Sequence, residues 1–267
     1  MSERNENNDT PLHLTIKNGK FETEQIKEKY INIKNKDGYT PLHLACMHKY
    51  RKDKTTETIT DYVLKILKKK PDISITDKEG NTMLHHLFYN IDLTTLIDNI
   101  TSDNDVFTTR GIWGIFRKID KNHYNIQNNS GNTFLHIFME YAIKHPSPLR
   151  IISDFITLPD LLTKFNLELS LKNKNGDTPL HVFLKSYKKN LPSVMTKVSG
   201  EIKKIYEHGE SYFNRYKLSL EIMIKNYLEA DTSLLYIKDN NNLTPYNLAL
   251  ELDNDVVNRL LNRIIFI

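Results

Sequence analysis

The chain is poor in residues that several classes of functional site require. Its 267 residues include a single cysteine, Cys46, which excludes an internal disulfide framework and a thiolate-rich metal site. The nine glycines form no glycine-rich phosphate loop. No apolar run approaches the roughly 18 residues that a membrane-spanning helix needs. We therefore expect a protein of a reducing, aqueous compartment that holds no cofactor and no metal.

The charge balance also argues against some partners. Lysine and arginine number 37 and aspartate and glutamate 33, which gives a formal net charge of +4. This mild excess falls short of the concentrated positive face of a dedicated nucleic-acid binder, so nucleic acid and acidic membrane surfaces are disfavoured partners. The first nine residues are polar and acidic, unlike a signal peptide. We expect a cytoplasmic protein, although a specialised system that secretes it into a host cell cytosol would need no such signal.

The most informative pattern is a four-residue phrase, Thr-Pro-Leu-His or a variant of it, that occurs six times. The copies begin at Thr10, Thr40, Thr82, Thr133, Thr178 and Thr244. A threonine hydroxyl can accept a hydrogen bond from a free N–H group in the first turn of a helix, and proline suits the first helical position because it has no N–H. Each phrase therefore predicts the start of a helix, with the leucine as its first buried residue.

A second pattern precedes five of the six threonines. Before Thr40, for example, Ile33 stands seven positions upstream and Gly38 two positions upstream, after apolar residues that alternate with polar ones. Alternation with period two that ends at a glycine or asparagine predicts a short β-hairpin, because these residues tolerate positive φ. Thr10 has Glu3 at the upstream apolar position, so we expect no hairpin in the first unit.

Together the two patterns resemble the ankyrin repeat. The resemblance implies an all-α dominated repeat solenoid, in which helix-turn-helix repeats are joined by short β-hairpins, with irregular inserts and lengthened helices. It begins at about residue 8 and implies a single ankyrin-repeat domain over residues 1–267. We expect about six repeats, at approximately 8–35, 36–77, 78–128, 129–173, 174–239 and 240–267.

The spacing of the repeats is irregular. Successive threonines of the phrase are separated by 30, 42, 51, 45 and 66 residues, against a usual ankyrin period of about 33. The excess predicts inserts near residues 49–58, 101–120, 144–166 and 188–216. The last excess fits either a degenerate repeat near Gly209 or two lengthened helices. We favour lengthened helices, because residues 212–216 have no Pro-Leu-His continuation.

The histidines of the phrase invite a metal-site interpretation. They are His13, His43, His85, His136 and His181. In ankyrin repeats this histidine bonds a neighbouring turn, and Asn247 at the same place in the last repeat fits hydrogen bonding better than metal ligation. Cys46 stands where the family has a small buried alanine, so we expect it to be a buried hydrophobe rather than a reactive thiol. We therefore assign no catalytic, cofactor-binding or metal-binding residue.

The resemblance implies that the hairpin tips and the ends of the first helices form a concave surface that binds a partner. The tip positions are Lys36, Asp37, Tyr39, Glu79, Asn81, Asn129, Asn132, Asn175 and Asp177, and the helix-end positions are Met47, His48, Tyr89, Asn90, Glu140, Tyr141, Lys185 and Ser186. Tyr39, Tyr89 and Tyr141 rank first, because tyrosine combines a large apolar area with a polar tip. Trp113, the only tryptophan, either folds over the second helices or projects as an apolar anchor for a partner.

These patterns predict a monomeric, non-enzymatic protein–protein interaction module. Ankyrin arrays with long irregular inserts resemble host-directed proteins of intracellular bacteria and of large DNA viruses, which implies an effector or scaffold that binds a partner protein of a host. Two alternatives stay open. One is an enzyme with an unrecognised site in the inserts, and the other is a binder of nucleic acid or acidic lipid through lysine clusters such as residues 68–70.

Overall fold

The structure is a computed structural model that describes residues 4–19, 26–47, 59–90, 112–144, 167–189, 224–225, 227 and 229–252; within these ranges the side chains of 59–61, 90, 112–113 and 142–144 are not described. The chain forms two compact units, Met1–Phe134 and Leu135–Ile267. The expected insert at 49–58, and almost all of those at 144–166 and 188–216, lie outside the described residues. The single domain of about six repeats stays a prediction.

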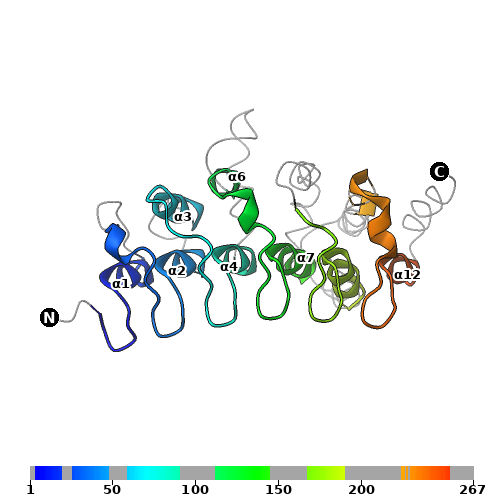
Figure 1. Ribbon diagram of the computed structural model, residues 1–267, viewed down its shortest axis with the longest axis horizontal. Helices are drawn as coiled ribbons and strands as arrows, with labels where there is room; N and C mark the ends of the chain where they lie inside the picture. The colour runs from blue at the N-terminus through cyan, green and yellow to red at the C-terminus, as the bar shows by residue number, and fades with distance from the viewer. Residues whose placement is uncertain are drawn as a thin grey trace, which may run out of the picture. The chain divides into compact units, whose positions relative to one another are not determined.

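Unit 1 contains three short helices that begin immediately after a threonine of the phrase, as expected. They are α1 (Pro11–Lys17), α2 (Pro41–Met47) and α4 (Met83–Asn90). Helix α2 packs against both α1 and α4, and the three lie side by side in Figure 1. Two further helices cover them, because α3 (Ile59–Leu67) packs on α2, and α6 (Ile112–Phe116) packs on α3. Single 3-10 turns, η2 (Glu28–Tyr30) and η3 (Lys121–His123), precede two of the loops.

Unit 2 repeats this plan. Its described helices are α7 (Phe134–Lys144, whose first residue closes unit 1), a helix over residues 179–189, η4 (Thr232–Tyr236) and α12 (Pro245–Leu250). Helix α12 packs against η4. The leucine of the phrase is buried at Leu135 and Leu180, whereas Tyr246 takes its place in α12 and is only half-buried. The fold is therefore an all-α repeat solenoid of helix pairs.

The segments predicted as β-hairpins form tight loops instead of strands. In the loop before Thr40, the Asn35 amide donates to the Tyr39 carbonyl at 2.9 Å. In a hairpin the Tyr39 amide would return the bond to the Asn35 carbonyl, but here it donates to the side-chain Oδ1 of Asn35 at 3.0 Å. The side chain replaces the second bond of a ladder, and none of the residues that the structure describes lies in a β-strand.

All six loops are closed in this way. Each carries an asparagine or aspartate five positions before the threonine, and these residues are Asn5, Asn35, Asp77, Asn128, Asn173 and Asp239. Their Oδ1 atoms accept hydrogen bonds from the amides two and four residues further on, at 2.7–3.1 Å. The first unit, for which no hairpin was expected, has the same kind of side-chain-closed loop. Asn5 and Asn8 (φ 58°) close its loop without an apolar residue seven positions upstream.

Neighbouring loops within unit 1 approach closely. The Lys36 amide donates to the Asn7 carbonyl, and the Asn129 amide donates to the Glu79 carbonyl, both at 2.9 Å. Gly80 lies at this contact with φ 77°, and a Cβ atom added to it would be 2.8 Å from the Asn129 nitrogen. Glycine is therefore required here for two reasons, its left-handed backbone and the proximity of the next loop.

Candidate partner-binding surface

The histidine of each phrase joins its helix to the next loop. His43 Nδ1 accepts a hydrogen bond from the Thr40 amide at 3.2 Å, so the ring carries its proton on Nε2, which donates to the Asn81 carbonyl at 3.1 Å. The same ring-to-carbonyl bond, at 2.8–3.2 Å, is made by His13, His85, His136 and His181. The prediction that these histidines bond neighbouring turns is confirmed.

Burial keeps these rings neutral. Desolvation is the main cause that lowers the pKa of His43 and of His85 to about 4, and it also lowers the pKa of His13 and of His181. A proton added to Nδ1 would face the amide that this atom accepts from, so protonation also breaks a hydrogen bond. The histidines are therefore neutral parts of the scaffold at neutral pH.

Neither the lone cysteine nor the possible metal ligands form a recognisable site among the described residues. Cys46 is fully buried, and burial raises the pKa of its thiol, so it is the buried hydrophobe that the sequence predicts. Across the described ranges no three histidine, cysteine, aspartate or glutamate side chains are grouped so that they could hold a metal ion. No helix in the part of the chain that the structure describes is both long and apolar enough to cross a membrane.

Five of the predicted partner-binding residues present exposed side chains that no described hydrogen bond or ion pair engages. They are Lys36, Asp37, Glu79, Tyr89 and Asn175. Tyr89 is 66% exposed, more than any other large hydrophobic residue described. Asp37, Glu79 and Asn175 share the position three residues before the threonine, so the same place in three loops presents three different side chains.

Two of the predicted residues, Asn81 and Asn129, are bonded to an adjacent loop. The Nδ2 atom of Asn128 donates to Asn81 Oδ1 at 2.7 Å, and the Nδ2 atom of Asn129 donates to the Lys78 carbonyl at 2.9 Å. These amide groups connect adjacent loops of unit 1. Their hydrogen-bonding capacity is thus partly used within the scaffold.

Two more, in unit 2, are bonded to each other. Lys185 Nζ donates to Asp177 Oδ1 at 2.5 Å and to Asp239 Oδ2 at 2.7 Å. Burial alone would lower the pKa of Lys185, but these two carboxylates raise it above its usual value. The lysine therefore bridges two successive loops.

The remaining predicted residues divide into two groups. Half-buried side chains belong to Tyr39, Met47, Asn132, Glu140, Tyr141 and Ser186. His48 lies outside the described residues, and Asn90 and Trp113 lie in helices α4 and α6 at positions whose side chains are not described.

The segment around Trp113, expected to belong to an insert, includes helix α6. Ile115 and Phe116 of this helix are buried. The Tyr124 hydroxyl donates to the Phe116 carbonyl at 2.6 Å, and the two rings stack with centroids 5.3 Å apart. These contacts fold the described end of α6 onto the core of unit 1, and the two interpretations of Trp113 stay predictions because its side chain is not described.

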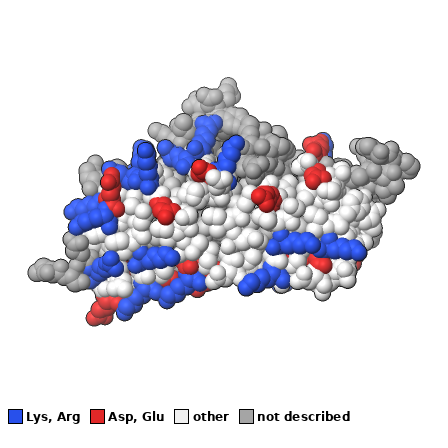
Figure 2. All heavy atoms as spheres, viewed as in Figure 1, with Lys and Arg blue, Asp and Glu red and all other residues white. Residues whose placement is uncertain are grey.

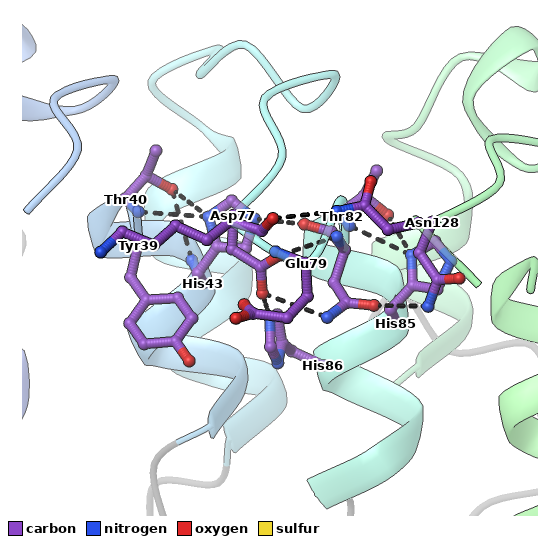
Figure 3. A network of polar contacts seen from close by, with 12 residues as sticks. Tyr39, Thr40, His43, Asp77, Glu79, Thr82, His85, His86 and Asn128 are labelled. Carbon is purple, nitrogen blue, oxygen red and sulfur yellow. Dashed lines mark hydrogen bonds and ion pairs between the residues drawn. The ribbon is translucent and has the colours of Figure 1, made fainter. Parts of the chain in front are cut away.

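Tyr39 is the centre of an aromatic cluster on the face of α2 and α4. Its ring meets the His86 ring edge-on, with centroids 5.5 Å apart and planes at 87°. The His43 ring is also 5.5 Å from His86, at 82°. In Figure 3 the side chains of Tyr39, Glu79 and His86 extend to the same side of the row of loop hydrogen bonds. Burial, and then the carboxylates of Asp77, Glu79 and Asp37, raise the pKa of the Tyr39 phenol.

Asp77 and His86 hold this cluster in place, and the sequence interpretation did not single out either residue. His86 Nε2 lies 2.7 Å from Asp77 Oδ2, and both side chains are buried. Burial alone would raise the pKa of Asp77, but the Asn81 amide and the His86 ring donate hydrogen bonds that lower it. The available signal was the recurrence of asparagine or aspartate five residues before every threonine, which is typical of side-chain-closed turns.

Charged side chains are interspersed on the surface. On the face that Figure 2 shows, the described lysine and arginine side chains lie in several groups with acidic side chains among them. A nucleic-acid binder is expected to gather its basic residues into one patch or stripe. This face therefore gives no support to the nucleic-acid alternative.

The comparisons with known proteins agree with this architecture. The family model of the ankyrin repeat matches residues 37–78. Over 220 residues, 70% of the chain, it is 24% identical to an ankyrin repeat protein of Acanthamoeba polyphaga mimivirus, of which the match covers 28%. Over 206 residues, 67% of the chain, it is 26% identical to the poly(ADP-ribose) polymerase tankyrase of Caenorhabditis elegans, of which the match covers 8%. The chain thus spans less than a third of the length of either relative.

With the six loop–helix units described above, these matches show that the chain contains ankyrin repeats. It resembles a viral ankyrin repeat protein. Ankyrin repeats are protein–protein interaction modules and are in general non-catalytic.

Proposed function

We propose that this chain binds a partner protein through the surface formed by its loop tips and the exposed side of its first helices. The proposal rests on one observation: the loop backbones are fixed by hydrogen bonds, while exposed side chains at their tips make no described hydrogen bond or ion pair. The loop backbones are held by side-chain Oδ1 atoms and by histidine rings, whereas Asp37, Glu79 and Asn175 project from equivalent positions. A rigid frame that presents different side chains binds with little loss of conformational entropy.

Tyrosine residues are the anchors that we propose for this surface. Tyr39 is half-buried against His86, and Tyr89 is exposed one helical turn beyond His86. In unit 2, Tyr141 is half-buried near the end of α7. Aromatic side chains with a large apolar area contribute disproportionately to binding energy in protein interfaces.

The viral relative supports a host-directed role. We propose that the partner is a host protein and that the chain acts as an effector or scaffold in the host cell cytosol. Because the chain covers 28% of that relative, the role is inferred for the repeats and not for a whole viral protein.

The test is affinity capture from a lysate of Acanthamoeba cells, the host in the name of the viral relative. The full chain is compared with the Tyr39→Ala, Tyr89→Ala, Tyr141→Ala triple variant. We expect specific proteins to be captured by the native chain and to be lost with the triple variant. Capture of the same proteins by both chains would overturn the proposed surface.

A matched control is available in unit 2. Tyr236 of η4 is 54% exposed and stacks on Tyr246, away from the loop tips. The Tyr236→Ala variant removes a similar aromatic area without touching the proposed surface, so it should capture the same proteins as the native chain. Far-ultraviolet circular dichroism of all variants establishes that the helices are retained.

A further inference from the structure

One part of the proposed surface, in unit 1, combines aromatic and acidic groups. It consists of Asp37, Tyr39, Met47, Glu79, His86 and Tyr89, which we call the Tyr39 patch. Its residues come from two adjacent loops and from the two helices that follow them, α2 and α4, which pack against each other.

The aromatic part of the patch has a fixed inner side and an open outer side. His86 is buried between Asp77, 2.7 Å away, and the edge-on ring of Tyr39. Tyr89 follows His86 by three residues, so the two share one face of α4. Met47 holds in α2 the position that Tyr89 holds in α4, seven residues after the threonine. The Tyr39 ring is therefore supported by His86, and the exposed Tyr89 ring lies on the same helix face as His86 and is accessible to a partner.

The charged part of the patch is acidic and unpaired. Asp37 and Glu79 are exposed at equivalent positions of adjacent loops, and neither carboxylate has an ion-pair partner among the described residues. Lys36 and Lys78 stand next to them in the chain. Even so, the charged groups that act on the Tyr39 phenol are carboxylates, those of Asp77, Glu79 and Asp37. Carboxylates of both loops therefore act on the phenol.

We propose that the Tyr39 patch binds an extended segment of the partner protein through an arginine side chain of that segment. A guanidinium is planar, stacks on an aromatic face and forms forked hydrogen bonds to carboxylates. Tyr39 supplies the ring, and Asp37 and Glu79 supply the two acceptors. Met47 and Tyr89 extend the patch with apolar area for a hydrophobic residue beside the arginine.

The charge of the patch favours an arginine-containing segment over an acidic or a purely apolar one. An acidic or phosphorylated segment would bring negative charge against two unpaired carboxylates, which is unfavourable. A purely apolar segment would desolvate Asp37 and Glu79 without a compensating bond. The inference rests on the proposed function, because it names the chemistry of the ligand at that same surface.

The test uses the full chain as bait for a phage library of random 12-residue peptides. We expect arginine to be enriched in the selected peptides over the unselected library, with a hydrophobic residue nearby. The Asp37→Asn, Glu79→Gln double variant should bind an individual selected peptide at least about tenfold more weakly. Replacing the arginine of that peptide by alanine should cost the native chain a similar factor.

The lysines of the same loop tips give a matched control. The Lys34→Gln, Lys78→Gln double variant, at two exposed lysines outside the predicted partner-binding residues, changes the same number of charges in the same loops, and we expect it to retain arginine-containing peptides with equal or higher affinity. Selected peptides without arginine enrichment would overturn this inference. If their binding were nevertheless lost in a Tyr39→Ala, Tyr89→Ala variant, the proposed function would stand. A failure to select any peptide would overturn the inference, and absence of partners in the lysate capture would separately overturn the function.

Discussion

His86 Nε2 lies 2.7 Å from Asp77 Oδ2, and this contact ties helix α4 to the loop that Asp77 closes. The other oxygen of the same carboxylate, Oδ1, accepts the amides of Glu79 and Asn81 at 2.9 and 2.7 Å. One side chain therefore fixes both a loop tip and the helix that supports it. Glu79 and Tyr39 owe their positions on the proposed surface to this arrangement.

The first prediction separates the two roles of Asp77. The Asp77→Asn variant retains an Oδ1 acceptor, as Asn35 and Asn128 do in their loops, and loses Oδ2, which faces His86 and also accepts from Asn81 Nδ2 at 3.2 Å. We expect it to lower the free energy of unfolding by about 1 kcal/mol. The Asp77→Ala variant also leaves two amides without an acceptor, and we expect a loss of about 2–3 kcal/mol.

Urea unfolding of the full chain, followed by circular dichroism, measures both changes. Equal losses for the two variants would mean that the His86 contact, and not the closure of the loop, is the important bond. The outcome bears on the proposed surface, because only the alanine variant should also displace Glu79.

The six phrases were enough to predict where the described first helices begin and that leucine is buried in them. Local chemistry explains this success, because a threonine cap, a proline and an apolar residue act within a single turn. The hairpins were predicted incorrectly, and the reason is again an interaction between residues close together in the chain. Period-two alternation does not reveal that an asparagine or aspartate side chain, such as Asn35, takes the amide that would complete a ladder.

The second prediction concerns acid. The folded-state pKa of His43 is about 4, below the usual 6.5, so the unfolded chain binds the proton first. The stability due to a neutral His43 is therefore complete above about pH 6.5 and is lost as the pH falls towards 4. Each such histidine contributes a slope of up to about 1.4 kcal/mol per pH unit in this window. We expect the free energy of unfolding to fall steeply between pH 6.5 and 4.

The chain itself supplies the variant that tests this. Asn247 takes the place of histidine in α12, and the Thr244 amide donates to its Oδ1 at 3.3 Å. His43→Asn should likewise keep the bond to Thr40 and lose the bond to Asn81, at a cost of about 1 kcal/mol at pH 7. The deficit should shrink on acidification and vanish within about one pH unit below 6.5, and at pH 4 the variant should be more stable than the native chain. Unfolding curves that stay parallel at all pH values would contradict the assignment.

The third prediction concerns Gly80. Alanine at this position adopts a strained backbone and brings its Cβ against Asn129, so we expect Gly80→Ala to lower the free energy of unfolding by about 2 kcal/mol. Asparagine tolerates positive φ, as Asn8 and Asn242 show in their loops. Gly80→Asn should therefore be less harmful by roughly 1 kcal/mol. Thermal unfolding checks the order, and an alanine variant as stable as the native chain would refute it.

The candidate site was less predictable than the fold. Assigning binding residues by their position in the repeat motif identified the exposed residues Asp37, Glu79 and Tyr89, because these positions recur at the same place in each repeat. It did not separate Tyr89 from Lys185, which holds the same position in its repeat but bonds Asp177. Nor did it predict that Tyr39 meets His86, 47 residues away, because such a contact depends on how neighbouring repeats are spaced.

The fourth prediction follows from Lys185, which bridges the carboxylates of Asp177 and Asp239. Burial alone would raise the pKa of Asp239, but the lysine and the Leu243 and Asn241 amides hold it below its usual value. Removing the lysine leaves two neighbouring carboxylates that repel each other. Since about a third of the Lys185 side chain is exposed, solvent screens part of this effect. We expect Lys185→Met to lower the free energy of unfolding by about 1–2 kcal/mol at pH 7.

Two measurements identify repulsion as the cause. Because the pKa of Asp239 is held below its usual 3.8, the stability from its pairing with Lys185 is lost only as the pH falls below that value, and there the native chain and the Lys185→Met variant should converge. A second substitution, Asp177→Asn, should restore part of the lost free energy of unfolding at pH 7, because the Asp239 carboxylate then has no like-charged neighbour. Asparagine is compatible with this position, since Asn81 and Asn132 occupy it in their loops. A double variant that is less stable than Lys185→Met alone would instead show that Asp177 stabilises unit 2 without the lysine.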